Sequence, residues 1–518
     1  MKNQKRGLSL MTLTADNITT LLADQDLLIS APDFDGEIQH LAYNSNDVVP
    51  GTLLFIKGNF KAEYLTDAIE KGVTAIIAPA SFKHATELPT WVADDVPAAM
   101  SIIAMAFYRY PQNNLALIGI TGTKGKTSTA YMAYEILRVY THDKVALSST
   151  LQVITGSEPQ YHYRAHLTTP ESVDLFRWMR EAVDNGMTHM VMEVSSQAFK
   201  MRRVYGLHFN VGIFLNISPD HIGENEHPTF EDYLQHKMML FDHSEQIVLN
   251  VDSDHFGELI AHAELMVHRD GIWLYGQEDV DSPKADIYFE ATDANLHGSV
   301  FKVREVGQQA EHLHIKGEYT LDMPGDFNQS NALAAMIATR LVGADAPAMA
   351  EGLETVKVPG RMQVLNTQNH GTIYVDYAHN YASIAALLQF VRQNESVNQL
   401  AIVVGAPGNK GVSRRPGIGK AVSEGADVVY LTSDDPQYED PAKIADEIQA
   451  AITNPKVTIY RELDRTKAIT AAIQSAGPDD VVVLAAKGLD EYQKIDGVDT
   501  PYENDWAVAN RIVSELER

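Results

Sequence analysis

The chain has 518 residues, with 41 Lys and Arg against 69 Asp and Glu, which gives a formal net charge of −28. This acidic excess argues against a nucleic acid as the main partner, because phosphate contacts need Lys and Arg in excess. The absence of cysteine excludes disulfides, thiolate nucleophiles and cysteine-ligated zinc. A content of 45% hydrophobic and 21% charged residues predicts about three globular domains rather than a disordered chain.

The N-terminus begins with basic residues, but its apolar run is short and is interrupted by Thr and Asp. It therefore lacks the unbroken apolar region of a signal peptide. No run approaches the roughly 18 apolar residues of a membrane span. We expect a cytoplasmic protein with no membrane insertion.

Residues 1–112 mix short predicted strands with helices. The apolar runs Leu53–Lys57 and Val73–Ala80 are bounded by Gly or Pro and predict strands. The segment Pro97–Pro111 predicts a helix that stops before its last proline, and the polar residues that follow predict a linker. We expect the first domain to end at residue 112.

Residues 113–357 have the pattern of a second domain. Leu115–Thr121 is a nearly continuous apolar run, as expected for a strand buried on both faces of a parallel sheet. A Gly-rich turn and a helix from Lys126 to about residue 139 follow, and alternating strands and helices predict a doubly wound α/β domain. Further buried strands are predicted at 189–194, 211–217 and 247–251, β-rich decoration at 285–323, and a helix from 325 to 343.

Residues 358–518 carry a second set of apolar runs, with helical patterns between them. These runs lie at 372–378, 400–406, 427–433, 457–462 and 479–486. The predicted fold class is therefore α/β in three domains: an N-terminal mixed α/β domain, a central P-loop ATPase-like parallel sheet and a C-terminal Rossmann-like domain.

The strongest motif is Gly122–Ser128, which lies after a predicted strand and opens a helix. Its backbone N–H groups can cradle phosphates, while Lys126 supplies a positive charge and Thr127 a hydroxyl for Mg²⁺. The motif departs from the P-loop pattern GxxxxGK[ST] in one place, since Ile120 stands where the first glycine is expected. The sequence predicts a nucleotide phosphate site.

Single polar residues near strand ends leave two interpretations open. Glu193 ends a predicted strand, where ligand crevices form, and is either a Mg²⁺ carboxylate or a structural one. His221 is either a ligand of a second metal or a structural histidine at a turn. Lys237, on a predicted helix, would by itself be interpreted as a solvated side chain.

Two basic groups could hold a polyanion or could be surface charge. One is Arg202–Arg203, and the other is Lys410 with Arg414–Arg415 in a Gly-rich loop. The segment Thr168–Glu171 is similarly open, because it is either a ligand contact or a helix N-terminus with proline in its first turn.

The order of the motifs GTKGKTS, TTPE, EVSS, NISPDHIG, GDFNQSN, PGRM, DYAHN and KGLDEYQ resembles the Mur ligase family over essentially the whole chain. The resemblance implies an ATP-dependent carboxylate–amine ligase of peptidoglycan precursor synthesis. In that reaction ATP phosphorylates the γ-carboxyl of D-glutamate in UDP-N-acetylmuramoyl-L-alanyl-D-glutamate. An amino acid then attacks the acyl phosphate through a tetrahedral intermediate.

The resemblance also implies roles for individual residues. The catalytic group would be Lys126, His221 and Lys237. Two Mg²⁺ ions would be held by Thr127, Glu193, His221 and Lys237, the last as a carbamate formed from CO₂. ATP would be held by Gly122, Thr123, Lys124, Gly125, Lys126, Thr127, Ser128, Asn328, Asn331, Arg361 and Asp376. The N-terminal domain would bind UDP-MurNAc, and the UDP-MurNAc-dipeptide would be held by Ser45 of that domain and by Thr168, Thr169, Ser195 and Arg203 of the central domain.

The motif at Asp434–Gln437 predicts which amino acid is added. Family members that use meso-diaminopimelate carry Asp-Asn-Pro-Arg, whose arginine pairs with the distal carboxylate, whereas this chain has Asp-Asp-Pro-Gln. Gln437 cannot supply the charged fork, and Asp435 and Asp490 add negative charge suited to a side-chain ammonium. We expect L-lysine, in a pocket that also includes Asp434 and Arg414. Ornithine stays open, because one methylene is worth only about 1–3 kcal/mol.

Other functions remain as alternatives. The same reaction could use L-ornithine or meso-diaminopimelate, or the chain could be a folylpolyglutamate synthetase-like ligase, although such an enzyme would lack the EVSSQAFK and DDPQ features. A P-loop regulatory ATPase would leave DYAHN and KGLD unexplained and would turn over ATP without an amino acid. We expect small-molecule partners and a monomer.

Overall fold

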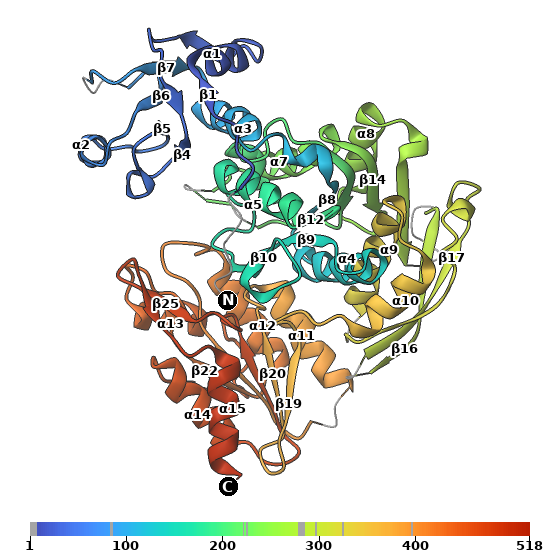
Figure 1. Cartoon of the computed structure of the whole chain (residues 1–518). Coiled ribbons are helices and arrows are strands. Elements are labelled where there is room, and N and C mark those ends of the chain that lie inside the picture. Colours follow the sequence, from blue (N-terminus) through green and yellow to red (C-terminus); the bar gives the residue numbers. More distant parts are fainter. Residues whose placement is uncertain are drawn as a thin grey trace, which may run out of the picture.

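The computed structural model describes residues 8–517 except 83–85, 221, 224–225, 278–284, 296–297, 324–325 and 395–396. Three large sheets follow one another along the chain. Figure 1 shows them in three regions: blue strands at the top left, the green and yellow central part, and the orange and red part at the bottom. Strands alternate with helices throughout, so the predicted α/β class is confirmed.

The N-terminal region holds a five-stranded sheet in the order β2-β7-β6-β5-β4, parallel except for the β2–β7 pair. The predicted strands at 53–57 and 73–80 are confirmed as β5 and β6. The elements are β1 (Leu13–Thr14), α1 (Ala15–Ala23), β2 (Leu28–Ser30), β3 (Glu37–Ile38), β4 (His40–Ala42), η1 (Ser45–Asp47), β5 (Thr52–Phe55), α2 (Ala62–Glu70), β6 (Ala75–Pro79), β7 (Thr90–Ala93) and α3 (Val96–Phe107).

The predicted helix before Pro111 is confirmed as α3, but the residues after it do not form an irregular linker. They form the 3₁₀ helix η2 (Pro111–Asn114), which begins after Tyr110 in a left-handed conformation. Proline favours the first helical turn because its missing N–H has no partner there in any case. Helix α3 is buried on nearly all sides and packs with apolar residues of both the first sheet and the central sheet.

The central sheet has eleven strands in the order β11-β10-β9-β12-β8-β13-β14-β15-β16-β17-β18. Its elements are β8 (Ala116–Thr121), α4 (Lys126–Thr141), β9 (Val145–Ser148), β10 (Gln152–Ile154), η3 (Pro159–Tyr161), β11 (His162–Arg164), α5 (Ser172–Asp184), β12 (His189–Glu193), α6 (Ser196–Lys200), β13 (Phe209–Phe214), α7 (Phe230–Asp242), β14 (Ser244–Asn250), α8 (Phe256–Met266), η4 (Arg269–Gly271), β15 (Ile272–Gln277), β16 (Ile287–Asn295), β17 (Gly298–Glu305), η5 (Ala310–His312), β18 (Gly317–Leu321), α9 (Asp326–Leu341) and α10 (Ala346–Thr355).

The predicted parallel sheet is confirmed at the centre of this region, and antiparallel strands extend it at both ends. Strands β9 to β16 of the sheet order are parallel neighbours, whereas β10, β11, β17 and β18 pair antiparallel. Short connections cannot make the crossover that a parallel pair needs. The stretch 285–323 is rich in strands as predicted, but it continues the central sheet instead of decorating it. Helices α4 and α9 pack on one face of this sheet.

The C-terminal sheet has the order β19-β20-β24-β21-β22-β23, and only β19 is antiparallel to its neighbour. One face is covered by α11, α12 and α13, and the other by α14 and α15. The elements are β19 (Gln363–Asn366), β20 (Thr372–Asp376), α11 (Tyr381–Asn394), β21 (Leu400–Val404), α12 (Arg414–Gly425), β22 (Val428–Leu431), α13 (Pro441–Ala450), β23 (Thr458–Arg461), α14 (Arg465–Ser475), β24 (Val481–Ala485), β25 (Tyr492–Ile495), β26 (Val498–Pro501) and α15 (Asp505–Leu516).

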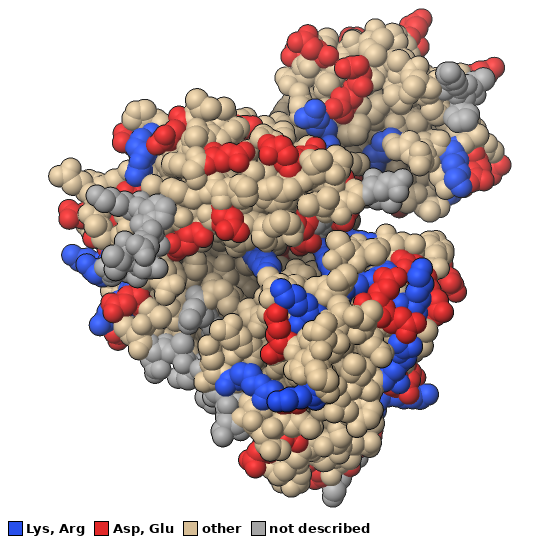
Figure 2. Space-filling view, turned by 180° about the vertical axis from the view of Figure 1, so that it is seen from behind, with Lys and Arg blue, Asp and Glu red and all other residues tan. Residues whose placement is uncertain are grey.

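Among the helices that the structure describes, none is both long and apolar enough to cross a membrane. Figure 2 shows Asp and Glu spread over the central part, and an open hollow between the N-terminal part at the upper right and the C-terminal part below it. In the central and C-terminal sheets, loops at the carboxyl ends of the parallel strands carry most of the predicted site residues, as is usual for open α/β sheets.

Replacing Asp505 by alanine is expected to destabilise the C-terminal region strongly. Its carboxylate forms a fully buried ion pair with Arg465, with a shortest N–O distance of 2.6 Å. Removing one partner leaves a buried unpaired charge, which costs about 3–5 kcal/mol. Thermal denaturation should show an apparent Tm lower by roughly 10 °C. The Asp499→Ala control breaks a partly exposed pair with Lys494 and should barely change the Tm.

Candidate active site

The phosphate-binding turn runs from the end of β8 into the start of α4. Gly125 has a φ of +83°, and a Cβ there would lie 2.5 Å from the Asn331 side-chain oxygen of α9, so only glycine fits. The Lys126 Nζ atom donates hydrogen bonds to the carbonyl oxygens of Gly122, at 2.8 Å, and Thr123, at 3.2 Å. The predicted strand, turn and helix are confirmed, and they bring Asn331 against the turn.

Residues Lys124, Thr127 and Ser128 complete this segment. The Lys124 backbone N–H donates to the Asn216 side chain, which follows β13. Thr127 and Ser128 are buried in the first turn of α4. Burial lowers the pKa of Lys126, and the carboxylate of Glu193 opposes that shift.

Lys237 is buried, not solvated, and lies beside the phosphate-binding turn. Helix α7 presents its side chain with 2% exposure, and its Nζ atom donates to the Gly122 carbonyl oxygen at 2.8 Å. This carbonyl therefore accepts from both Lys126 and Lys237. Burial first, and then the neighbouring Lys126 charge, lower the pKa of Lys237 well below its usual value. The neutral, nucleophilic amine is correspondingly easier to form.

Glu193 ends β12 with its carboxylate fully buried. The carboxylate accepts hydrogen bonds from the Thr150 backbone N–H, at 2.8 Å, and from the Thr150 hydroxyl, at 3.1 Å. Thr127 is also buried, at the start of the neighbouring helix. A hydroxyl and a carboxylate are hard oxygen donors of the kind that Mg²⁺ prefers, so this donor set fits the metal that the sequence predicts.

Thr169 and Ser195 lie at the backbone of Glu193, and Thr168 is linked to the Glu193 carboxylate through Thr150. The Thr169 hydroxyl donates to the Glu193 carbonyl oxygen at 2.9 Å, and the Ser195 N–H donates to the Thr169 hydroxyl oxygen at 3.0 Å. Thr168 accepts a hydrogen bond from the Thr150 hydroxyl at 3.1 Å. Three segments of the chain, which carry Thr150, Thr168 with Thr169, and Ser195, thus form one hydroxyl-lined group.

Arg203 lies next to this group and contacts the Glu171 carboxylate. A lysine of the N-terminal region contacts the same carboxylate. The Arg203 Nε donates to Glu171 at 3.2 Å, and the Lys57 Nζ lies 2.6 Å from the same carboxylate. Sequence reasoning missed Lys57, although it is the last residue of the predicted strand Leu53–Lys57. Ser45 lies apart, because its described contacts are with Lys71 and Asp67 of the α2 region.

The predicted basic groups separate into different roles. His221 lies outside the described residues, but its neighbour Asp220 pairs with Arg414 of α12 at 3.0 Å, which ties the central and C-terminal sheets together. Arg415 is buried and paired with Glu439 at 3.0 Å and with a second glutamate of α13. Arg202 pairs with Asp95 at the start of α3.

Arg361 and Asp376 meet at the end of β20. The Asp376 carboxylate accepts backbone N–H bonds from Met362 and Ala378, and an Arg361 nitrogen lies 3.8 Å from it. Burial raises the pKa of Asp376, and the Arg361 charge opposes the shift. The guanidinium lies over the Tyr377 ring, 5.3 Å from its centre. Asn328 is buried beside Asn331 on α9, with their side chains 3.5 Å apart.

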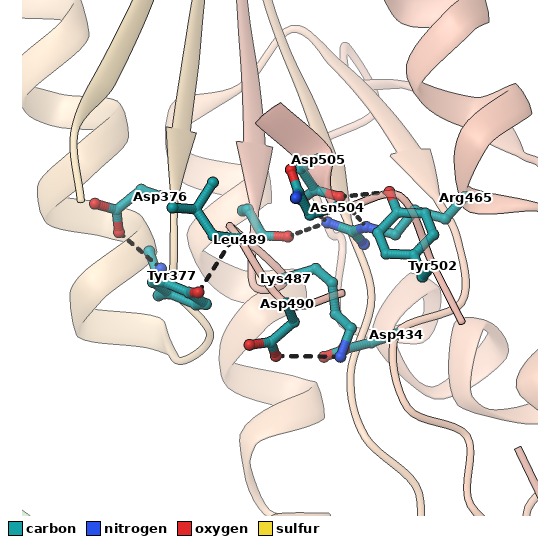
Figure 3. Close-up of polar contacts among 12 residues, drawn as sticks. Asp376, Tyr377, Asp434, Arg465, Lys487, Leu489, Asp490, Tyr502, Asn504 and Asp505 are labelled. Atoms are coloured by element: carbon teal, nitrogen blue, oxygen red, sulfur yellow. Dashed lines mark hydrogen bonds and ion pairs between the residues drawn. The ribbon is translucent and has the colours of Figure 1, made fainter. Parts of the chain in front are cut away.

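Asp434, Asp435 and Asp490 surround one lysine that sequence reasoning missed. The Nζ atom of Lys487, which is 1% exposed, lies 2.8 Å from Asp435, 3.2 Å from Asp490 and 3.9 Å from Asp434. Figure 3 shows this lysine between Asp434 and Asp490. Three carboxylates against one ammonium leave an excess of negative charge. Burial raises the pKa of Asp434 to about 6.

Tyr492 links this acidic cluster to the central sheet. The Lys487 Nζ lies 4.6 Å from the centre of the Tyr492 ring, and the Arg164 guanidinium, on β11, lies 4.5 Å from it. The two cations therefore share one aromatic ring across the two sheets. The sequence gives no signal for the contact between Arg164 and Tyr492, because these residues are more than 300 positions apart.

Gln437 lies beside the acidic cluster and has a left-handed backbone, with a φ of +55°. Its N–H donates to the Lys494 carbonyl oxygen at 2.9 Å. It lines a cavity of about 640 Å³ together with Tyr438, Gln493 and Asp496, whereas the described lining does not include the carboxylates around Lys487.

The chain belongs to the Mur ligase family. The family model described as "Mur ligase middle domain" matches residues 120–339, and the one described as "Mur ligase, glutamate ligase domain" matches residues 360–488. The resemblance stated from the motif order is thereby confirmed.

Several proteins of this family are similar to the chain over nearly its whole length. The chain is 48% identical to a UDP-N-acetylmuramyl-tripeptide synthetase of Ligilactobacillus salivarius, covering 92% of this chain and 94% of that one. It is 45% identical to the UDP-N-acetylmuramoyl-L-alanyl-D-glutamate–L-lysine ligase of Enterococcus faecalis, covering 92% of each. A solved UDP-N-acetylmuramoyl-L-alanyl-D-glutamate–2,6-diaminopimelate ligase has a TM-score of 0.62 at 26% identity, over 98% of this chain and 100% of that one.

Proposed function

We propose that this chain is an ATP-dependent ligase that joins L-lysine to the D-glutamate γ-carboxyl of UDP-N-acetylmuramoyl-L-alanyl-D-glutamate, in peptidoglycan precursor synthesis. The observation that carries the proposal is the cluster of Asp434, Asp435 and Asp490. These three carboxylates hold more negative charge than the single Lys487 ammonium neutralises. The names of the Ligilactobacillus and Enterococcus relatives support the reaction. We divide the chain into domains at 1–112, 113–357 and 358–518.

The first step needs the ATP phosphates beside the substrate carboxylate. The turn from Gly122 to Ser128 binds the phosphates through its backbone N–H groups, and Lys126 contributes its positive charge. Asn328 and Asn331 contact adenine, and Arg361 with Asp376 holds ATP from the C-terminal domain. The γ-carboxylate oxygen attacks the terminal phosphorus, the bond to ADP breaks, and an acyl phosphate forms.

The second step needs an uncharged amine beside the acyl carbon. Ser45, Thr168, Thr169, Ser195 and Arg203 hold the UDP-MurNAc-dipeptide. The α-amino nitrogen of lysine attacks the acyl carbon, phosphate leaves from the tetrahedral intermediate, and the nitrogen loses a proton as the amide forms.

We propose that two Mg²⁺ ions bind near the phosphate-binding turn, where Thr127 and Glu193 offer hard oxygen donors. Thr127, Glu193, His221 and a carbamate on Lys237 would hold them. Mg²⁺ bound there would screen the charges of the reacting anions and would stabilise the negative charge that develops in the transition state. The buried amine of Lys237 supports a carbamate, because only the neutral form of an amine adds to CO₂.

The incoming amino acid is selected by charge. The excess carboxylate charge around Lys487 attracts the side-chain ammonium of lysine, and Gln437 offers no cation to a distal carboxylate. Arg414 completes the pocket from α12. L-ornithine satisfies the same charge pattern and is therefore the alternative that the experiment must separate.

The test is phosphate release from ATP with Mg²⁺ and UDP-N-acetylmuramoyl-L-alanyl-D-glutamate, with L-lysine, L-ornithine and meso-diaminopimelate supplied separately. We expect release that requires lysine, with the tripeptide product seen by mass spectrometry. Preference for diaminopimelate would overturn the interpretation of Asp435 and Gln437. Phosphate release that no amino acid changes would overturn the ligase itself.

Lysine binding is expected to weaken as the pH falls through about 6. Burial raises the pKa of Asp434 to about 6, so its carboxylate gains a proton below that pH and no longer attracts an ammonium. The KM for lysine should therefore rise between pH 7.5 and 5.5, by up to roughly tenfold per pH unit below the pKa. Steady-state kinetics at saturating ATP measure the effect. An unchanged KM for lysine across this pH range would show that Asp434 does not contact the lysine substrate.

A further inference from the structure

His227 is fully buried between α6 and the start of α7 and uses both ring nitrogens. Its Nε2 atom lies 2.9 Å from the Ser196 hydroxyl oxygen, and its Nδ1 atom lies 2.6 Å from an Asp232 carboxylate oxygen. An ionised carboxylate only accepts hydrogen bonds, so Nδ1 donates to Asp232 and Nε2 accepts from the Ser196 hydroxyl. Burial lowers the pKa of His227, which is consistent with this neutral ring.

A second contact joins the same two helices. Lys200, at the end of α6, lies 3.0 Å from the Asp232 carboxylate and donates to the Glu226 carbonyl oxygen at 3.0 Å. Asp232 therefore receives one hydrogen bond from a buried imidazole and one contact from an ammonium. Both lead back to α6, so Asp232 is the point at which α6 and α7 are held together.

Helix α7 carries Lys237, and α6 directly follows the turn that holds Glu193 and Ser195, so both helices adjoin residues on which the proposed function depends. Ser196 directly follows Ser195 and lies three positions after Glu193, in the turn at the end of β12. Asp232 lies in the first turn of α7, five positions before Lys237. A shift of either helix would change the separation between Glu193 and Lys237.

We propose that His227 is a positioning residue, which holds the turn carrying Glu193 and Ser195 in register with the helix carrying Lys237. This inference rests on the proposed function for the roles of those three residues. The contacts from Ser196 through His227 to Asp232 connect α6 to α7. Hydrogen bonds behind metal ligands fix the direction of those ligands. We expect this chain of contacts to hold Glu193 and Lys237 in the same way.

The same side chains suggest two other uses, which the geometry favours less. His227, Asp232 and His236 could hold a metal ion, since one ligand atom of each lies within 4.8 Å of the others. However, the Lys200 ammonium already lies beside Asp232, and a cation there opposes a metal ion. Ser196, His227 and Asp232 also have the connectivity of a hydrolase triad, but Ser196 is buried and cannot meet a substrate.

The test compares His227→Leu with His262→Leu as a matched control. His262 also contacts an aspartate of α7, Asp242 at 2.8 Å, but at the opposite end of the helix from Asp232. Hydrogen exchange of the ligand-free proteins is the first readout, because it does not depend on the reaction. We expect exchange in the segments 193–200 and 230–237 to become at least tenfold faster in His227→Leu only.

Kinetics and binding are the second readout. We expect His227→Leu to lower kcat about 10–100-fold and to weaken calorimetric binding of UDP-N-acetylmuramoyl-L-alanyl-D-glutamate, with the lysine KM within twofold of the original. His227→Gln, which can both donate and accept, should recover part of the loss. A lysine KM that changes as much as kcat would indicate a general loss of structure and would overturn the positioning role.

Ser196→Ala keeps the inference testable if His227→Leu does not fold. It removes only the hydroxyl and leaves His227 bonded to Asp232, so we expect the same direction of change, with kcat lower by about 3–10-fold.

Unchanged exchange and unchanged kinetics in folded variants would overturn the inference. A transition metal, which imidazole ligands suit, found by elemental analysis in the original protein and lost in His227→Leu would replace it with the metal site. Failure of the original protein to ligate lysine would instead overturn the proposed function, whatever the exchange result.

Discussion

Replacing Lys237 by alanine is expected to lower ligation by at least about 100-fold, because the proposed carbamate is itself a metal ligand and losing even a partner behind a ligand costs about 10–100-fold. The side chain is 2% exposed and its pKa is lowered by burial, so its amine is available to react with CO₂. In the carbamate that we propose, the neutral nitrogen would bond to the carbon of CO₂ and lose a proton, which would place an anion beside the phosphate-binding turn. Lysine-dependent phosphate release measures the loss.

Short carboxylic acids should recover part of this loss. Acetate or formate can enter the space that the shortened side chain leaves and supply a carboxylate in place of the carbamate. The Lys237→Arg variant provides the control, because a guanidinium keeps the positive charge but forms no carbamate; it should stay inactive with or without the acid. Full activity in Lys237→Ala would show that the carbamate role is wrong.

The P-loop and its surroundings could be predicted because their signals are local. The buried run before Gly122, the turn and the amphipathic start of α4 lie within thirty residues, and each restricts its neighbours. The strands ending near Glu193 and Asp376 were predicted for the same reason, since both faces are covered and the sequence shows a continuous apolar run.

The central sheet's antiparallel ends had a weaker signal. The strands around residues 152–164 are three residues long, and so short a run cannot be distinguished from a loop by alternation. The strands after residue 285 were predicted, but a single sequence does not say which sheet edge they extend. Their pairing with β15 is a contact between segments whose order along the chain leaves several edges open.

The side chains that complete the site depend on contacts over long sequence distances. Lys487 lies within the KGLD motif, but its position among three carboxylates follows only once β22 and β24 are neighbours of β21. The burial of Lys237 was missed because its helix has polar and apolar residues on every turn. His227 was missed because an isolated histidine before a proline carries no pattern of its own.

Replacing Asp435 by asparagine together with Gln437 by arginine is expected to change which amino acid is added. The pair restores the Asp-Asn-Pro-Arg order of the diaminopimelate-using members. Asp435 lies 2.8 Å from the Lys487 ammonium, so its loss removes part of the negative charge that attracts the substrate ammonium. Removing one partner of a buried charge pair costs about 2 kcal/mol or more, so kcat/KM for lysine should fall roughly 30-fold.

Diaminopimelate should become a substrate in the same variant, because arginine at position 437 supplies a two-pronged cation for its distal carboxylate. Comparing kcat/KM for lysine, ornithine and diaminopimelate separates a change of preference from a general loss. Asp499→Asn, on the exposed hairpin of the same region, should leave all three values unchanged. If the double variant loses lysine without gaining diaminopimelate, the cavity beside Gln437 does not receive the end of the substrate side chain, and selection rests on the carboxylates around Lys487 alone.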